Sequence, residues 1–389
     1  MLAATGATAL GALLLREGVC KADDPAQQVE DRGADIKISA LRAWRVGGKV
    51  YLKIETNRGI FGWGEITGLE PNVAAKLAAS LFDLLDGENP TRIEHLWQKL
   101  YRAHRDIRGG PFMTHTISAI DMALWDITGK AWGVPVHRLL GGPVRDKIRM
   151  YTSPTTYKIG PGGPRPFAAS PAEIKGMVDH IAQIRKRLGP SGLIMVDLHC
   201  AFPPPHVIQL AAAIEPYDIL FLEEPAVPGN IEVFKRIKEQ VRIPLATGER
   251  DRTIWGMIPY LHERCIDVLQ PDVGHTGGIS QMKKIATLAE AYFVPLAPHC
   301  GSTLLGMTAS LHATAAIPLF LIHEGGKGHD PFGVVKKKWT VDEKGYCTIP
   351  EGPGLGITID QAKVEKIAAQ PKKYRWPRSK YPDGSVSDY

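Results

Sequence analysis

The heptapeptide ILFLEEP, residues 219–225, runs from four apolar residues directly into two adjacent carboxylates. A short apolar run bounded by proline predicts a buried strand that ends at Glu223. Two neighbouring carboxylates repel each other unless positive charge lies close to them. A metal ion is one source of that charge, and its other ligands can be sought along the chain.

Five more short apolar runs end on an ionisable residue, and stretches with helical spacing separate them. Strands that alternate with helices predict a parallel sheet built from βα units. The terminal residues, spaced 23 to 27 residues apart, are Asp197, Glu223, Glu249, Asp272, His299 and Glu324. This interval fits one unit of a (β/α) barrel, which takes about 250 residues for eight units. We therefore expect all six side chains at the rim where the carboxyl ends of the strands converge.

Three of these acids, Asp197, Glu223 and Glu249, are expected to face one another across neighbouring strands. Three carboxylates without a thiolate suit a hard cation such as Mg²⁺, with water or substrate oxygens completing six-coordination. A strand-end cap or a salt-bridge partner is an equal alternative for any single acid. It is a much weaker interpretation for six ionisable residues in register.

The residues before the barrel have a different pattern. Residues 49–66 alternate apolar and polar positions around Asn57-Arg58-Gly59, which predicts a β-hairpin. Apolar residues then recur at helical spacing in 71–85, 91–103 and 114–133, so this part is an α+β module. The expected division of the chain is a leader and linker (1–34), a capping domain with a helical lead-in (35–147), the barrel (148–330), and a return to the cap with a basic tail (331–389).

The first 15 residues, MLAATGATALGALLL, are small and apolar. They are too short to span a bilayer and are similar to the core of a signal peptide, although a basic start is missing. Export to the periplasm is therefore expected, and a packed or disordered arm on a cytoplasmic protein is the alternative. Half of the net charge of +6 lies in residues 371–389, and no nucleic-acid-binding motif accompanies it. Five cysteines without paired spacing form neither a disulfide framework nor a zinc site.

Six motifs carry a family resemblance: VDLHC (196–200), FLEEP (221–225), ATGER (246–250), LQPDVGHTGGIS (269–280), APHC (297–300) and IHEG (322–325). With ISAIDMALWDITGKAWGVPVHRLLGG (117–142) and IPEGPGLGITID (349–360), they resemble the enolase superfamily. The type is that of mandelate racemase and muconate lactonizing enzyme, in the D-galactonate dehydratase-like branch of sugar-acid dehydratases. The resemblance implies a modified TIM barrel of (β/α)7β type. An α+β cap would come from the N-terminal part and the C-terminal return.

The resemblance also implies a role for each rim residue. Asp197, Glu223 and Glu249 would bind Mg²⁺. His299 would act as the base, oriented and charged by Asp272, and His199 would act as the acid. Glu324 would hydrogen-bond the reacting carboxylate. Glu224 would lie behind the metal or pair with a cation. Because residues i and i+2 of a strand share a face, His199 is expected to point into the site beside Asp197. Cys200 and Cys300 are expected to point away from it.

The implied reaction is dehydration of an aldonate to a 2-keto-3-deoxy acid. An epimerase with the same two histidines on opposite faces of its substrate is one alternative. A non-catalytic carbohydrate-binding protein on this fold is another, although a binding protein needs no base. The expected partners are a small sugar acid and further copies of the chain, without nucleic acid or a membrane span. Cap loops at Arg45–Lys49 and Gly68–Asn72 are expected to contact the distal hydroxyls.

The sequence departs from the family pattern in several places. The Lys-x-Lys pair of many relatives is not evident on the second barrel strand, where Lys158 is the nearest lysine. Only 46 residues separate Tyr151 from Asp197, so the first barrel helix is expected to be missing or replaced by a loop. The stretches PHCGSTLLG (298–306) and IHEGGKGHD (322–330) differ from the galactonate enzymes, which leaves the particular sugar acid open.

Overall fold

The computed structural model describes residues 35–151, 169–337 and 339–370, with Tyr374, Lys380 and residues 384–386 of the tail. The expected leader and Lys158 lie outside the described residues, as does most of the shortened segment after Tyr151. Within these ranges, no helix combines the length and apolar character that a bilayer span requires.

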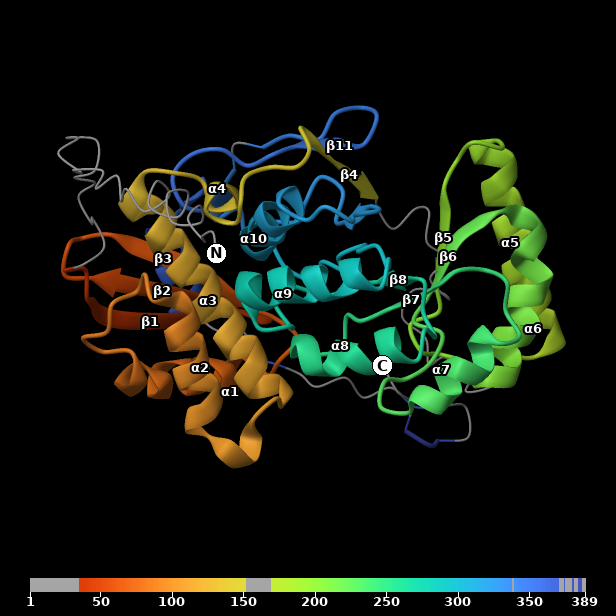
Figure 1. Ribbon diagram of the computed structural model, residues 1–389, viewed down its shortest axis with the longest axis horizontal. Coiled ribbons are helices and arrows are strands. Elements are labelled where there is room, and N and C mark those ends of the chain that lie inside the picture. Colours follow the sequence, from red (N-terminus) through yellow and green to blue (C-terminus); the bar gives the residue numbers. More distant parts are fainter. Residues whose placement is uncertain are drawn as a thin grey trace, which may run out of the picture.

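An antiparallel sheet and three helices form the N-terminal part (Figure 1). The strands β1 (Ile38–Val46), β2 (Lys49–Thr56) and β3 (Phe61–Ile66) pair in that order, which confirms the predicted hairpin. The helices are α1 (Pro71–Ser80), α2 (Ile93–Ala103) and α3 (Pro111–Trp132). Gly62 and Gly64 let α3 lie directly on β3, because a Cβ at either position would approach a backbone oxygen of α3 within 2.0 Å.

A series of parallel strands follows. It comprises β4 (Lys147–Tyr151), β5 (Ile194–Asp197), β6 (Ile219–Glu223), β7 (Leu245–Thr247), β8 (Val268–Leu269) and β9 (His323–Glu324). Strands β5 to β8 pair in order, and parallel bridges at Leu296 and Phe320 continue the series. Strand β9 then pairs in parallel with β4. The helices between them are α5 (Pro171–Leu188), α6 (Pro204–Ile214), α7 (Ile231–Lys238), α8 (Thr253–His262), α9 (Gly278–Ala291) and α10 (Leu304–Ala315).

The parallel series has seven segments among the described residues: the strands β4 to β8, the bridge at Leu296, and the segment from Phe320 through β9. Each segment contributes one residue to an inner apolar cluster. Its members are Tyr151, Met195, Phe221, Ala246, Val268, Ala297 and Ile322. Alternate residues of a strand point to opposite faces of the sheet. A cluster that receives one residue from every segment therefore lies inside a curved, nearly closed sheet. The larger outer cluster fills the layer between these strands and their helices.

The series is interrupted between β4 and β5. Among the described residues no strand joins them, and the other edge of β4 pairs antiparallel with β11 (Tyr346–Thr348). A cavity of about 630 Å³ lies at this break, lined by Tyr151, Leu193, Met195 and Val341 among others. The predicted loss of the first barrel helix concerns residues 152–168, which the structure does not describe.

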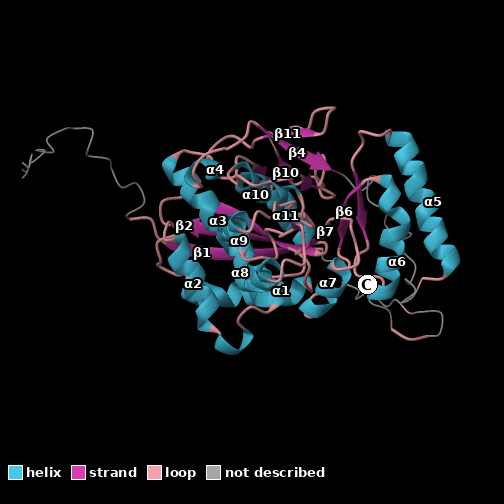
Figure 2. Cartoon of the chain, turned by 45° about the vertical axis from the view of Figure 1, so that its right-hand side comes forward, coloured by secondary structure: helices cyan, strands magenta, loops and turns pink. Residues whose placement is uncertain are grey.

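The C-terminal segment returns to the first sheet, as the cap prediction requires. Its elements are β10 (Val335–Lys336), β12 (Thr358–Ile359) and α11 (Gln361–Ala368), and α11 packs against β1. The Asp126 carboxylate on α3 accepts hydrogen bonds from the backbone of both Trp63 and Leu355, and thereby joins the two parts. In Figure 2 this cap lies at one end of the molecule and the helices α5 and α6 lie at the other. The domain limits at residues 34, 147 and 330 stay predictions.

Candidate active site

The predicted rim residues do lie at the carboxyl ends of the parallel strands. Asp197 and Glu223 are paired in register as the last residues of β5 and β6. Glu249 follows β7, and Asp272 follows β8. Each of these four acids is buried.

Glu223 lies among three other acids. Burial, and then the charges of Asp197, Glu324 and Glu249, raise the pKa of Glu223 well above its usual value. Burial also raises the pKa of Glu249 to about 7, although His299 lowers it. Carboxylates held together in this way resist ionisation until positive charge is added. A divalent cation supplies that charge, so the residues present fit a hard metal ion.

The second acid of the opening motif has a cation of its own. The Arg250 guanidinium donates to both carboxylate oxygens of Glu224, with distances of 2.6 Å and 2.8 Å. A bidentate pair of this geometry is strong, and the Glu224 side chain is fully buried. Glu224 adopts a positive φ of 46° directly after the end of β6. The prediction that Glu224 pairs with a cation is confirmed.

Among the residues that the structure describes, two groups of potential metal ligands are compact, with their ligand atoms within 4.8 Å of one another. They are His199 with Glu224 and Glu249, and Asp272 with His275 and His299. Only Glu249 among the predicted ligands belongs to either group. Glu224 already has both oxygens on Arg250, and both oxygens of Asp272 accept hydrogen bonds from protein groups. Neither compact group therefore offers three uncommitted ligands.

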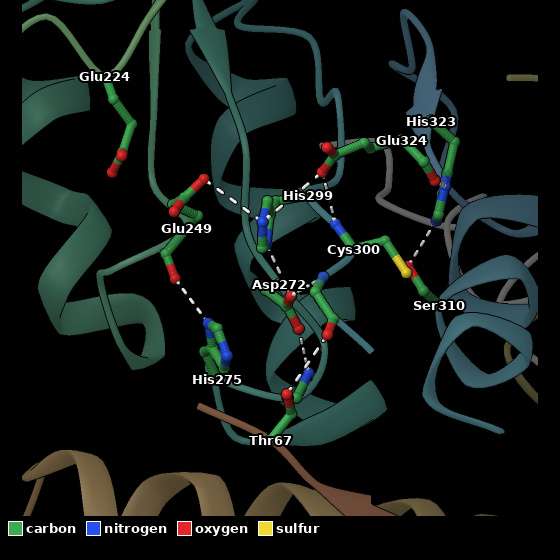
Figure 3. A network of polar contacts seen from close by, with 12 residues as sticks. Thr67, Glu224, Glu249, Asp272, His275, His299, Cys300, Ser310, His323 and Glu324 are labelled. Atoms are coloured by element: carbon green, nitrogen blue, oxygen red, sulfur yellow. Dashed lines mark hydrogen bonds and ion pairs between the residues drawn. The ribbon is translucent and has the colours of Figure 1, made fainter. Parts of the chain in front are cut away.

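The His299 ring is oriented by one short hydrogen bond. Its Nδ1 lies 2.7 Å from Oδ2 of Asp272. Its Nε2 faces two other carboxylates, 3.5 Å from Glu249 Oε2 and 3.6 Å from Glu324 Oε2 (Figure 3). Because Nδ1–H donates to the Asp272 carboxylate, Nε2 is the nitrogen that can accept a proton.

The charges around the dyad act in opposite directions on its two members. Burial alone would lower the pKa of His299, but Glu249, Glu324 and Asp272 outweigh burial and raise it well above the usual value. Burial alone would raise the pKa of Asp272, but His275, His299 and the amide of Gly301 bring it well below the usual range. The pair is thus a carboxylate beside an imidazole that readily becomes an imidazolium.

His199 reaches the site by a route that strand alternation does not describe. Strand β5 ends at Asp197, and His199 has a left-handed φ of 48°. Its backbone N–H donates to Oδ1 of Asp197 at 2.8 Å, which stabilises the turn. The ring then lies near Glu224 and Glu249. Strand alternation therefore does not set the direction of this ring, because the strand ends before His199, and the role of His199 stays a prediction.

Glu324 lies beside the dyad. Oε2 of Glu324 accepts a hydrogen bond from the Cys300 backbone at 3.0 Å, which keeps the carboxylate near His299. The sulfur of Cys300 points away from His299 (Figure 3). Cys200 donates its thiol to the carbonyl of Ala226 at 3.2 Å.

Tyr151 is a site residue that the sequence interpretation missed. It is the last residue of β4 and is paired in register with Glu324 of β9. Its hydroxyl is buried and has no hydrogen-bond partner among the described residues. Burial, and then Glu223 and Glu324, raise its pKa well above the usual value, so it is a neutral donor beside the acids. Its place at a strand end was the available signal, since the same rule identified the other rim residues.

The two predicted cap loops contact each other and the rim. Nη1 of Arg45 donates to Oδ1 of Asn72 at 3.1 Å. Nζ of Lys49 donates to the Gly301 carbonyl at 2.6 Å and also contacts the hydroxyl of Thr67. The cap therefore touches the loop that follows His299.

Comparison with known proteins covers nearly the whole described chain. Residues 37–141 match the mandelate racemase / muconate lactonizing enzyme N-terminal domain, and residues 145–363 match the enolase C-terminal domain-like family. A D-galactonate dehydratase of Ralstonia pickettii is 36% identical over 91% of this chain and 100% of its own length. A D-galactonate dehydratase of Pectobacterium atrosepticum is 34% identical over the same shares.

Solved structures agree with the fold class. The 3,6-anhydro-D-galactonate cycloisomerase of Zobellia galactanivorans is 30% identical, with a TM-score of 0.77 over 85% of this chain and 99% of that one. A mandelate racemase/muconate lactonizing enzyme-like protein of Rubrobacter xylanophilus is 27% identical, with a TM-score of 0.78 over 86% and 98%. The predicted capped, modified TIM-barrel fold is confirmed. The chain belongs to the enolase superfamily, in the family of mandelate racemase and muconate lactonizing enzyme.

Proposed function

We propose that this protein is a hydro-lyase, a magnesium-dependent sugar-acid dehydratase. It would convert an aldonate to a 2-keto-3-deoxy acid. The observation that carries the proposal is the Asp272–His299 dyad, whose free Nε2 faces the carboxylates of Glu249 and Glu324. The relatives named D-galactonate dehydratase support the same reaction class.

Asp197, Glu223 and Glu249 would hold the metal. The raised pKa of Glu223, which follows from burial among other acids, fits a site that receives a cation. When bound, the divalent ion supplies the positive charge that stabilises negative charge developing on the substrate carboxylate. Glu224 stays with Arg250 and supports the site from behind.

His299 would remove the proton at C2. This proton is weakly acidic, so the base must be positioned and unprotonated when it acts. A cation bound beside Glu249 would offset the negative charge that raises the pKa of His299. The electrons of the C2–H bond move to the adjacent carboxylate and give an enediolate. The proton stays on Nε2, and Asp272 stabilises the imidazolium through Nδ1.

His199 would supply the acid for the second half of the reaction. Hydroxide at C3 is a poor leaving group, so a proton must be added as the C3–O bond breaks. The enediolate electrons form the C2–C3 double bond, and water leaves. The enol that results becomes the 2-keto-3-deoxy acid. Glu324 would hydrogen-bond the reacting carboxylate from the side of β9.

An epimerase is the second candidate, and the position of Glu249 favours it. This acid lies in a compact group with His199 and is also 3.5 Å from Nε2 of His299. Two histidines around one proposed ligand could work on opposite faces of a substrate. Loss of the hydroxyl distinguishes the two reactions, because an epimerase retains it.

The test is incubation of the purified protein with individual aldonic acids and Mg²⁺, beginning with D-galactonate. Formation of a 2-keto acid is followed by a colorimetric carbonyl assay, and NMR identifies the product. We expect one or a few acids to yield a 2-keto-3-deoxy product. A product that keeps its hydroxyl group but has an inverted carbon centre would show that the protein is an epimerase and not a dehydratase. Tight binding without turnover of any acid would favour the carbohydrate-binding alternative.

A further inference from the structure

We infer that Lys49 and Thr67 of the cap are positioning residues that hold the Asp272–His299 dyad through Gly301. Their catalytic effect rests on the proposed function, whereas their contacts do not. Lys49 begins β2, and Thr67 directly follows β3, so both belong to the sheet that closes over the barrel.

Gly301 is the residue through which the cap reaches the dyad. Its N–H donates to Oδ2 of Asp272 at 3.0 Å, and this oxygen also accepts the hydrogen bond from His299. Its carbonyl accepts the Lys49 ammonium at 2.6 Å and the Thr67 hydroxyl at 3.4 Å. A side chain here would crowd the base, since a Cβ would lie 3.1 Å from Cε1 of His299. The cap thus holds the carbonyl of Gly301, and the N–H of Gly301 holds the dyad.

Thr67 makes a second connection to Asp272. Its methyl group packs on Gly274, where an added Cβ would lie 2.9 Å from Cγ2 of Thr67 and 3.1 Å from Oδ1 of Asp272. The N–H of Gly274 donates to this Oδ1 at 2.6 Å. Both oxygens of the Asp272 carboxylate are therefore fixed by backbone groups that lie against Thr67, which itself is only 2% exposed (Figure 3).

A stacked pair of histidines fixes Thr67 itself. Nδ1 of His115 on α3 bonds the Thr67 carbonyl at 2.9 Å. The His115 ring stacks on His275, with centroids 4.3 Å apart and planes at 14°. His275 in turn bonds the backbone carbonyl of Glu249 at 2.9 Å. This stack links the helix of the cap to the barrel loop of a proposed metal ligand, so the position of Thr67 is set by both parts.

These contacts make the geometry of the base depend on how the cap is seated. Asp272 orients the His299 ring, and a displacement of about 1 Å in a catalytic group can cost about 100-fold in rate. A cap that is displaced would withdraw Lys49 and Thr67 from Gly301 and release one of the donors that hold Asp272. A cap in the correct position on the barrel would therefore hold the His299 base in its working orientation as well as cover the substrate.

Paired variants test this inference. Lys49→Met and Thr67→Val remove the donors and keep the approximate shape, whereas Lys49→Arg and Thr67→Ser keep a donor. Lys76→Met, on an exposed part of α1, is the control. We expect the first two variants to lower kcat about 10- to 100-fold while KM changes much less. The Arg and Ser variants should recover part of the loss, and the control should not change kcat.

Amide hydrogen exchange of residues 299–303 supplies a readout independent of turnover. We expect faster exchange of the Gly301 amide in Lys49→Met and Thr67→Val, with unchanged exchange in Lys76→Met. Unchanged exchange in both donor-removing variants would overturn the inference, as would a raised KM with an intact kcat. If the wild-type protein dehydrates no aldonate, the proposed function fails, but hydrogen exchange still decides whether Lys49 and Thr67 hold Gly301.

Discussion

Oδ2 of Asp272 lies 2.7 Å from Nδ1 of His299, and this contact determines which ring nitrogen faces the proposed metal ligands. Asp272→Asn keeps the size of the side chain but removes its charge and can reverse the tautomer of the ring. We expect kcat to fall about 100- to 10,000-fold with little change in Mg²⁺ affinity. Steady-state kinetics and calorimetry on the same preparation measure both. An activity close to wild type would mean that His299 does not need this partner.

If the carboxylates at the ends of β5, β6 and β7 bind the metal, removing any one of their charges should weaken Mg²⁺ binding. Asp197→Asn, Glu223→Gln and Glu249→Gln each remove one charge, so each should weaken Mg²⁺ binding about tenfold or more and abolish turnover. Isothermal calorimetry on the folded variants is the measurement. Glu232→Gln, an exposed change on α7, is the control. Equal Mg²⁺ affinity in all three site variants and in the control would exclude this ligand set.

The raised pKa of Glu249 predicts how the stability of the metal-free protein depends on pH. Burial raises it from 4.5 to about 7, so the folded protein holds a proton that the unfolded chain releases above pH 4.5. The contribution of Glu249 to the free energy of unfolding should therefore decrease as the pH rises from 4.5 to 7. Glu223 shifts in the same direction.

Thermal unfolding in EDTA measures this effect. Buried histidines act in the opposite sense, because burial lowers the pKa of His115 to about 3 and that of His323 to about 4, so comparison with Glu249→Gln isolates the carboxylate. We expect the melting temperature of the wild type, relative to that of Glu249→Gln, to fall between pH 5 and pH 7.5, and excess Mg²⁺ to reduce this fall. An identical pH dependence in the two proteins would contradict the burial of Glu249.

The contact between Arg45 and Asn72 joins the two cap loops. Arg45→Ala should change the preference among aldonic acids more than it changes Mg²⁺ binding, since the loop is expected to contact the distal hydroxyls. Arg42→Ala is a matched control, because Arg42 also lies on β1 but pairs with Glu55 of β2. Relative kcat/KM values for several acids test the prediction. An altered Mg²⁺ affinity with an unchanged preference would show that Arg45 acts on the barrel.

The sequence predicted the parts of the fold that depend on regular spacing. Residues that recur every 23 to 27 positions at the ends of apolar runs had to share one rim once the strands were parallel. The register of Asp197 with Glu223, and the short bond between Asp272 and His299, follow from that arrangement. The alternating hairpin in the cap was predictable for the same reason, because its pattern is local.

Other features depend on tertiary contacts that spacing does not contain. The left-handed backbone at His199 follows from the end of β5 and from the Asp197 side chain, and strand alternation could not give it. The Arg250–Glu224 pair joins two strand ends across the rim. Lys49 was expected to contact the substrate as part of the loop Arg45–Lys49, and only the folded cap brings it to Gly301, which is 252 residues away in the chain.

The separate roles of the two histidines can be measured by NMR of an aldonate substrate in deuterium oxide with Mg²⁺. His299→Asn should stop both dehydration and exchange of the C2 proton, because the base is lost. His199→Asn should stop loss of the hydroxyl and leave C2 exchange, since proton removal does not need the acid. Exchange at the wild-type rate in His299→Asn would contradict the assignment of the base, and loss of exchange in His199→Asn alone would reverse the two roles.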